Sequence, residues 1–440
     1  MTPFTRLTLP NGLLVLLKEI HTAPLISHWI WYRVGSRDEQ PGLSGISHWV
    51  EHMQFKGTPQ FPASQLDREI SRLGGHWNAF TTPDWTAFFE TLPTAHIDLA
   101  LRIEADRMIN SQFDPLEVET ERTVIISERQ GSENEPLFRL GEQVLAAAFK
   151  VHPYQHEVIG DIDDLQRMQL DDLYRHYRSY YQPNNAVLTI AGDFNTSEML
   201  ARVTDLYGQL PAAELPARPK REEPPQDSER QVMVEGPGET TYVQFAYHVP
   251  AAVHADFLPL AVLDSLLCGP SDLSVFGGGL SNKTCRLYRA LVEKELAVSV
   301  YGFLQAMVDP HLHTITTLVH PQSSAEMLAA ALEGEVQRIQ DTPPTKEDVA
   351  RAVKQARALF VYNSESITNQ AAWLGCAEMF ATHAWLESYL DRLAAVTPED
   401  VQRAAQTYLR PQNRVLGIYL PTGDGGDTWT EPNVDTSYAS

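Results

Sequence analysis

The chain repeats one short pattern near the end of each of its halves. Residues 180–188 return as residues 408–416 at a constant offset of 228, which carries Pro183 onto Pro411. In each copy, a helical pattern ends before the proline and an apolar run typical of a strand follows. A constant offset over several matching positions favours duplication over chance identity. The sequence therefore predicts two homologous domains.

One segment divides the chain into halves of similar size. Residues 211–230 are rich in proline and charged side chains and contain almost no large apolar ones. Such a segment cannot bury surface and should be extended. We therefore predict a metal-binding domain at residues 1–210, a linker at 211–230, a homologous domain without a metal at 231–423, and a loose polar tail at 424–440.

Strand patterns precede groups of helical patterns in the first half. Residues 13–17 and 26–34 are rich in aliphatic and aromatic side chains, which favours strands. Periodic apolar residues predict helices at 46–55, 66–73, 97–109, 116–129 and 170–181. This order indicates an α+β fold, in which each domain packs helices on one face of a mainly antiparallel sheet.

The overall charge and hydropathy exclude some classes of function. The net charge is −23, so we expect no nucleic-acid surface, because phosphate binding needs clustered Lys and Arg. No segment approaches eighteen uninterrupted apolar residues, so we expect no membrane span. The N-terminus has no basic stretch followed by a long apolar run, as a signal peptide would have. If Met1 is the native start, this predicts a cytoplasmic protein.

The strongest chemical signal is His48-x-x-Glu51-His52. On a helix each residue turns by about 100°, so the two histidines lie one turn apart on one face, with the glutamate beside them. Two imidazoles in this arrangement can bind one Zn²⁺, and the carboxylate can take a proton from a water that the metal activates. The alternative is a surface helix that carries these residues by chance.

A catalytic zinc site needs a third protein ligand, for which residues 116–129 offer several acids. If this segment is helical, Glu117, Glu121 and Glu128 lie within about 40° of one another, while Glu119 points roughly the opposite way. The shared face could supply a ligand or could be a solvated acidic stripe. Helical geometry alone does not choose among the three carboxylates.

With several further motifs, the chain resembles the family of inverted-motif zinc peptidases that contains pitrilysin, insulin-degrading enzyme and mitochondrial processing peptidase. The matching segments, in chain order, are residues 48–52, 55–58, 74–81, 121–128, 152–154, 277–281 and 296–300. The resemblance spans nearly the whole chain. It implies two similar α+β domains, of which the first holds zinc.

The resemblance also implies roles for individual residues. It assigns the zinc to three ligands, His48, His52 and Glu128. It makes Glu51 the general base and Glu121 the carboxylate that orients a ligand histidine. Asn78 and Ala79 correspond to an edge strand on which family members bind an extended peptide as an added strand.

The second half departs from the family pattern. Active members carry an Arg and, seven residues later, a Tyr in a stretch similar to G-L-A-Y-S-V, but here Leu291 and Val298 stand at those positions. The expected helix at 257–267 also lacks an H-x-x-E-H motif. The lost pair would hold substrate and the developing oxyanion. Tyr301 is an alternative donor from a slightly shifted position.

These observations lead to two hypotheses about function. The first is a zinc endopeptidase subunit that hydrolyses extended or unfolded peptides in an enclosed chamber. A homologous partner subunit would supply the Arg and Tyr in a heterodimer. In a homodimer both copies would lack these two residues. The second hypothesis is a non-catalytic family member that acts as an assembly or substrate-presenting subunit. An intact metal motif favours the first.

Overall fold

The computed structural model describes residues 4–218, 221–270, 283–363 and 365–423. The strands of the first half are β1 (Thr5–Thr8), β2 (Leu14–Glu19), β3 (Leu25–Tyr32), β4 (His76–Thr81), β5 (Thr86–Pro93) and β6 (Ala186–Gly192). Its helices are α1 (Ile46–Met53), α2 (Ala63–Arg72), α3 (Ile97–Asn110), α4 (Pro115–Ser132), α5 (Pro136–Ala148), α6 (Ile162–Arg167), α7 (Leu170–Tyr180) and α8 (Thr196–Tyr207).

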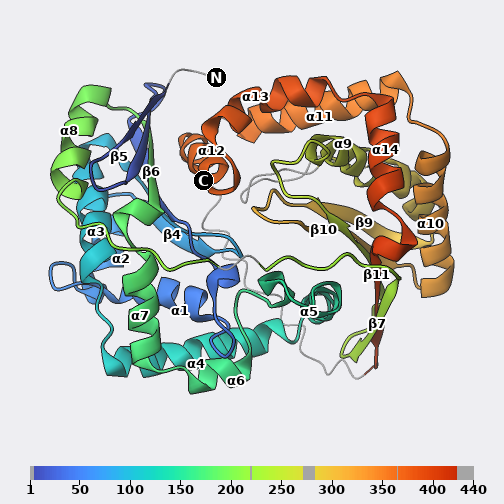
Figure 1. Ribbon diagram of the computed structural model, residues 1–440, viewed down its shortest axis with the longest axis horizontal. Helices are drawn as coiled ribbons and strands as arrows, with labels where there is room; N and C mark the ends of the chain where they lie inside the picture. Colours follow the sequence, from blue (N-terminus) through green and yellow to red (C-terminus); the bar gives the residue numbers. More distant parts are fainter. Residues whose placement is uncertain (1–3, 219–220, 271–282, 364, 424–440) are drawn as a thin grey trace.

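The second half has the same mixture of strands and helices. Its strands are β7 (Arg230–Gly236), β8 (Tyr242–Val249), β9 (Ala297–Leu304), β10 (His311–Val319) and β11 (Arg414–Pro421). Its helices are α9 (Phe257–Cys268), α10 (Ala325–Asp341), α11 (Lys346–Asn363), α12 (Ile367–Phe380), α13 (His383–Ala394) and α14 (Pro398–Tyr408). The two sheets lie on opposite sides of the molecule, with helices on their outer faces (Figure 1).

The two sheets share one topology, which confirms the predicted homologous α+β domains. The strand orders are β1-β2-β6-β3-β5-β4 and β7-β11-β8-β10-β9. Apart from the extra β1, each sheet has one parallel pair, β2–β6 or β7–β11, and is otherwise antiparallel. The repeated sequence also makes the same contact twice. Asn185 Nδ2 donates to Tyr180 O and Asn413 Nδ2 to Tyr408 O, each over 2.8 Å.

Each domain places one helix on the sheet of the other domain. Helix α5 packs on β7 and β11, and α12 packs on β3 and β6. A Cβ at Gly375 of α12 would lie 2.0 Å from Trp31 Nε1, so the helix backbone rests on the buried indole. A Cβ at Gly417 of β11 would lie 2.7 Å from Val144 Cγ2 of α5. Both sheets are therefore covered on a second face as well, an exchange that the sequence did not predict.

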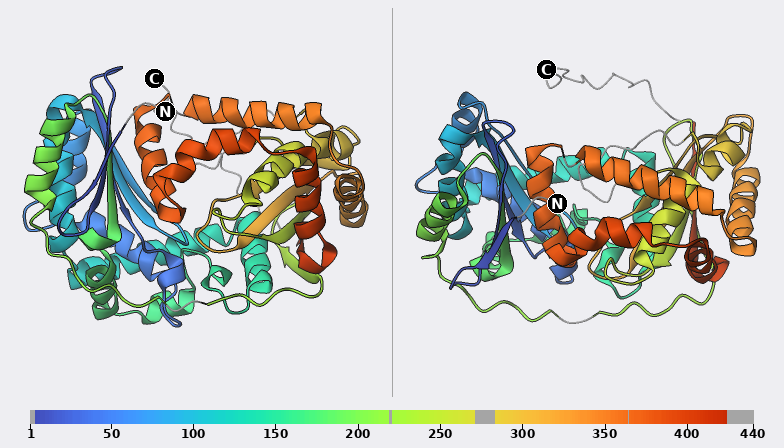
Figure 2. Two further views of the ribbon diagram at one scale, coloured as in Figure 1. Left: turned by 45° about the horizontal axis from the view of Figure 1, so that its top comes forward. Right: turned by 90° about the horizontal axis from the view of Figure 1, so that it is seen from above.

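The described residues of the predicted linker, 211–218 and 221–229, run outside the domains without helix or strand, and β7 begins at Arg230 (Figure 2). Polar contacts attach the linker to the domains. Arg218 Nε lies 2.9 Å from Asp38 Oδ1, and the Glu223 carboxylate accepts backbone N–H groups of residues 150–152 over 2.8–3.0 Å. A cavity of about 850 Å³ lies between this linker and both domains.

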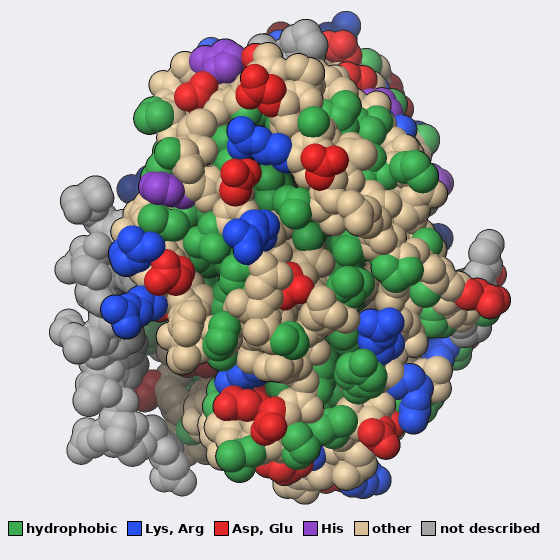
Figure 3. All heavy atoms as spheres, turned by 90° about the vertical axis from the view of Figure 1, so that its left-hand side faces the viewer, with side chains coloured by type: hydrophobic (Ala, Val, Ile, Leu, Met, Phe, Trp, Pro, Cys, Tyr) green, Lys and Arg blue, Asp and Glu red, His purple; other side chains and the backbone are tan. Residues whose placement is uncertain are grey.

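Acidic and basic side chains are interspersed on the face of the first domain that carries α3 and α8 (Figure 3). Within the part of the chain that the structure describes, no helix combines the length and the apolar character needed to cross a membrane. The predicted tail at 424–440 and the matching segment at 277–281 lie outside the described residues.

Candidate metal centre

Helix α1 begins where buried polar contacts fix the chain. Gly45 precedes the helix with φ +89°, and a Cβ there would lie 2.5 Å from Ile159 O. The buried carboxylate of Glu39 accepts the N–H groups of Gly45 and Ser47, each over 2.9 Å. Ser47 Oγ lies 3.3 Å from His176 Nε2 on α7. The first turn of α1 is thus anchored, as a helix that must present side chains accurately requires.

The two histidines of α1 face a glutamate of α4. His48 Nε2 and His52 Nε2 lie 3.2 Å apart. Glu128 Oε1 is 4.0 Å from His48 Nε2, and Glu128 Oε2 is 3.7 Å from His52 Nε2. Among the described residues, these three form the one group of His, Cys, Asp or Glu side chains able to hold a metal ion, with ligand atoms within 4.8 Å of one another.

This donor set fits zinc. A tetrahedral Zn²⁺ at about 2.0–2.2 Å from its ligands separates neighbouring ligand atoms by about 3.4 Å. The observed separations, 3.2 to 4.0 Å, bracket that value. The side chain of Glu128 is 47% exposed and has room to close the longer gaps. Two imidazoles and one carboxylate also leave the fourth position that a catalytic site needs.

The surroundings of the α1 side chains shift their protonation. Burial, and then the nearby His52, lowers the pKa of His48 to about 3, which keeps its ring neutral as a metal ligand must be. Burial lowers the pKa of His52, but the hydrogen bond to Glu121 and the nearby carboxylates outweigh it and raise the pKa. Burial raises the pKa of Glu51 to about 7, in the range suited to proton transfer near neutral pH.

The structure distinguishes the three acids that the sequence left open. Glu128 reaches both Nε2 atoms, as described above. Glu121 Oε1 lies 2.9 Å from His52 Nδ1, on the far side of that ring. Glu117 Oε2 lies 3.6 Å from Lys56 Nζ, and among the described side chains Glu117 forms no ion pair or hydrogen bond with either histidine. The three carboxylates of this face therefore occupy three different positions.

Strand β4 forms the open edge of the first sheet beside α1. Among the described strands it pairs with β5 alone, and α1 packs against it. The Ala79 N–H donates to Asn78 Oδ1 over 2.8 Å instead of joining the β-ladder. Two residues further along the strand, Thr81 Oγ1 donates to Glu51 Oε2 over 2.6 Å. Both predicted peptide-binding residues thus lie on an edge strand that also touches the glutamate of the metal motif.

Within its described residues, the second domain has no comparable set of metal-binding groups. Leu291 is fully buried in a π-helical turn, and Val298 lies at a β-bulge on β9 with 48% exposure. Tyr301, on the same strand, is 42% exposed. Between the turn and the strand, Glu295 has a φ of +58°. This residue stands where the family stretch has glycine, which explains the left-handed backbone.

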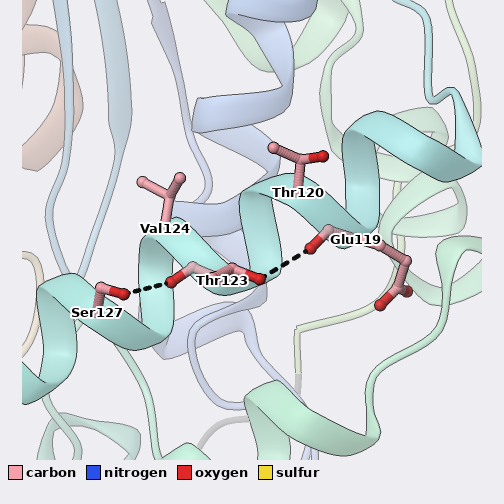
Figure 4. A pocket seen from close by; sticks show the side chains of 5 residues that line it. All are labelled: Glu119, Thr120, Thr123, Val124 and Ser127. Carbon is pink, nitrogen blue, oxygen red and sulfur yellow. Dashed lines mark hydrogen bonds between the residues drawn. The ribbon is translucent and has the colours of Figure 1, made fainter.

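A shallow hollow of about 600 Å³ lies along another side of α4 (Figure 4). Five residues line it, Glu119, Thr120, Thr123, Val124 and Ser127. Thr123 Oγ1 donates to the Glu119 carbonyl and Ser127 Oγ to the Thr123 carbonyl, so these hydroxyls are satisfied within the helix. The hollow includes none of the metal-binding group and is a groove on the helix surface.

Two contacts of the metal centre were missed by sequence reasoning, those of Thr81 and Lys56. Period-two alternation along β4 could have placed Thr81 on the same side as Trp77 and Ala79. Lys56 lies just after α1 in the F-x-G-T motif, and its ammonium group contacts Glu121 Oε2. Nothing in the spacing of the sequence indicated that contact, because the two residues are far apart in the chain.

Comparison with known proteins finds matches over most of the chain. The family model described as "Insulinase (Peptidase family M16)" matches residues 14–162, and the one described as "Peptidase M16 inactive domain" matches residues 167–356. The zinc protease PqqE of Helicobacter pylori is 28% identical over 410 residues, which cover 92% of this chain and 89% of that protein.

Two further comparisons cover almost the whole chain. The mitochondrial-processing peptidase subunit beta of Blastocladiella emersonii is 27% identical over 92% of this chain and 86% of its own. The crystal structure of a protease from Helicobacter pylori matches with a TM-score of 0.88 and 27% identity, covering 95% of this chain and 99% of that one. The two family models match consecutive parts of the chain, and the first contains the whole metal-binding group. The chain therefore belongs to peptidase family M16.

Proposed function

We propose that this chain is a zinc-dependent endopeptidase subunit whose metal is held by His48, His52 and Glu128. The observation that carries the proposal is the convergence of two imidazole nitrogens 3.2 Å apart with one carboxylate within 4.0 Å, beside Glu51 and an open edge strand. Relatives named zinc proteases support the choice of metal. Zinc, when bound, supplies a Lewis acid that activates water and polarises the peptide carbonyl.

Glu51 is the general base of the proposed reaction. Its carboxylate takes a proton from the attacking water and delivers it to the leaving amine. Because Thr81 holds one oxygen of this carboxylate, the other remains available for the transfer. Glu121 accepts from His52 Nδ1 and thereby presents Nε2 of the same ring to the metal.

The substrate is an extended or unfolded peptide that adds a strand to β4 at Asn78 and Ala79. Backbone hydrogen bonds along an edge strand give affinity with little demand on side chains. None of the described strands pairs with the outer edge of β4, which supports this mode of binding. A stably folded protein offers no such strand, so its unfolded form should be cut much faster. Equal rates for both forms would contradict this mode.

A homologous partner subunit completes the enzyme by closing a chamber and supplying an Arg and a Tyr. A preorganised donor to the oxyanion is typically worth about 3–4 kcal/mol, and neither Leu291 nor Val298 can donate. A heterodimer fits better than a homodimer, which lacks the pair twice. One relative is itself named a subunit. The rival donor is Tyr301, because burial raises its pKa to about 12 and so keeps its hydroxyl protonated.

The missing pair also favours a second candidate, a non-catalytic subunit for assembly or substrate presentation. Zinc content and hydrolysis of an unfolded peptide by the purified chain, alone and with homologous subunits, decide between the two. About one zinc per chain with hydrolysis only in the presence of a partner supports the first proposal. Hydrolysis by the chain alone, abolished by Tyr301→Phe, would replace the partner with Tyr301. Zinc binding without hydrolysis in any combination would favour the non-catalytic subunit.

A further inference from the structure

We propose that Lys56 is a positioning residue of the metal centre, which holds the Glu121 carboxylate in the orientation that fixes the ring of His52. This inference rests on the proposed zinc site. It adds a dependence of metal affinity on a cation, Lys56, that is neither a ligand nor the carboxylate that orients one.

The three side chains form a continuous line. Lys56 Nζ contacts Glu121 Oε2, while Glu121 Oε1 lies 2.9 Å from His52 Nδ1. The Glu121 side chain is only 8% exposed and that of Lys56 is 22% exposed, so water competes little for this ion pair. A buried carboxylate is costly unless its oxygens are satisfied. His52 is hydrogen-bonded to one oxygen, and the ammonium group of Lys56 forms an ion pair with the other.

The backbone around Lys56 is held in place. Lys56 ends a 3₁₀ turn that follows α1, and Gly57 comes next with φ +86°. A Cβ at Gly57 would lie 2.5 Å from Ala63 N, so only glycine fits this close approach. The Gln112 N–H donates to Gly57 O over 3.0 Å and ties the turn to the loop before α4. The origin of the Lys56 side chain is therefore fixed relative to both helices of the metal centre.

Metal binding depends on these three side chains because, among the described residues, only one of the two imidazoles has a hydrogen-bond partner at Nδ1. His48 Nδ1 is buried and has no hydrogen-bond partner among the described residues. The orientation of the histidine pair therefore relies on the contact between His52 and Glu121. If the carboxylate turned away, His52 would lose the acceptor that keeps its proton on Nδ1 and its Nε2 free for the metal.

Zinc affinity, measured by competition with a chelator, tests the inference. Removing a carboxylate that supports a metal ligand typically weakens binding by about 10–100-fold, so we expect Lys56→Met, one contact further out, to weaken it by about tenfold. Lys56→Arg should restore most of the affinity because it keeps the cation. Lys354→Met, at an exposed lysine of α11, is the matched control and should bind zinc as the wild type does.

A double-mutant cycle separates positioning from a general effect on the fold. If Lys56 acts through Glu121, then Lys56→Met combined with Glu121→Gln weakens zinc binding no more than Glu121→Gln alone. Additive losses would overturn the inference, as would wild-type affinity in Lys56→Met. The metal-free Lys56→Met variant could unfold at a lower temperature than Lys354→Met. In that case the zinc affinity of Lys56→Arg, compared with that of the wild type, decides whether the cation positions Glu121. A wild-type chain without zinc affinity would instead refute the proposed function itself.

Discussion

The hydroxyl group of Thr81 donates to the carboxylate of Glu51 over 2.6 Å and so joins edge strand β4 to helix α1. One residue is on the strand proposed to receive the peptide, and the other is the proposed base. A shift of the strand would therefore move the base as well. In the proposed enzyme, the same strand determines where the peptide lies and where its proton acceptor lies.

We expect Glu51→Gln to keep zinc and to lose peptide hydrolysis. The amide cannot take the proton, whereas the three ligands are unchanged. A general base of this kind typically contributes about 10²–10⁴-fold to the rate. The prediction is checked by measuring zinc per chain, and the turnover of an unfolded peptide by the chain together with its partner subunit. Near-normal turnover would remove Glu51 from the mechanism.

Thr81→Val should lower turnover without changing zinc affinity. A hydrogen bond to a charged group is worth about 1.5–3 kcal/mol, which corresponds to roughly a 10–100-fold loss. The Thr81 hydrogen bond lowers the pKa of Glu51, so its removal raises that pKa and moves the acidic limb of the pH–rate profile to higher pH. Thr81→Ser keeps the donor and should retain the wild-type profile. An unshifted limb in Thr81→Val would contradict this role.

Glu128→Gln should strongly reduce zinc retention, because a neutral amide is a poor zinc ligand. Glu119→Gln is a matched control on the same helix, since Glu119 pairs with Arg122 at the surface and lines the hollow on another side of α4. Metal analysis after dialysis compares the two variants. Full zinc content in Glu128→Gln would show that the third ligand is misassigned.

Gly375→Ala should destabilise the protein although alanine favours helices. The added methyl would lie 2.0 Å from Trp31 Nε1, and overpacking of this kind typically costs about 1–3 kcal/mol. Gly334→Ala, in α10, meets nothing within 4 Å and should stabilise by up to about 1 kcal/mol. Thermal unfolding measures both. Equal shifts in the two variants would mean that α12 does not rest on the indole.

Glu295→Gly should stabilise the protein by roughly 0.5–1 kcal/mol. The left-handed backbone costs a non-glycine residue about 1–2 kcal/mol, part of which is offset by the greater freedom of glycine when unfolded. Glu293→Gly, two residues earlier in right-handed helical backbone, should instead be neutral or destabilising. A lower unfolding temperature for Glu295→Gly than for the wild type would contradict the conformation assigned here.

Local patterns made much of this molecule predictable. The H-x-x-E-H spacing placed three side chains of α1, and apolar periodicity predicted α2, α3, α4 and α7 but not α5, α6 or α8. The repeated prolines at 183 and 411 revealed two domains of one fold. Each of these signals lies within a short stretch of chain, where secondary structure alone decides which residues share a face.

Other features that escaped prediction depend on contacts between distant parts of the chain. Helical geometry put Glu117, Glu121 and Glu128 on one face, but the position of α1 decides which of them reaches an imidazole Nε2. Helix α12 is buried on nearly all sides, so its sequence indicates burial without identifying the sheet that covers it. The contacts of Lys56 with α4 depend on the same packing of separate elements.

The exchanged helices determine when, during synthesis, the first sheet receives the cover of its second face. The face of the first sheet that carries Trp29, Trp31 and Phe89, three stacked aromatic rings, receives its cover from α12, whose first residue is Ile367. A ribosome completes every strand of that sheet long before it makes this helix. The nascent N-terminal half therefore exposes an aromatic surface while the rest of the chain is translated. Released on its own, this half would bind chaperones instead of forming a stably folded domain.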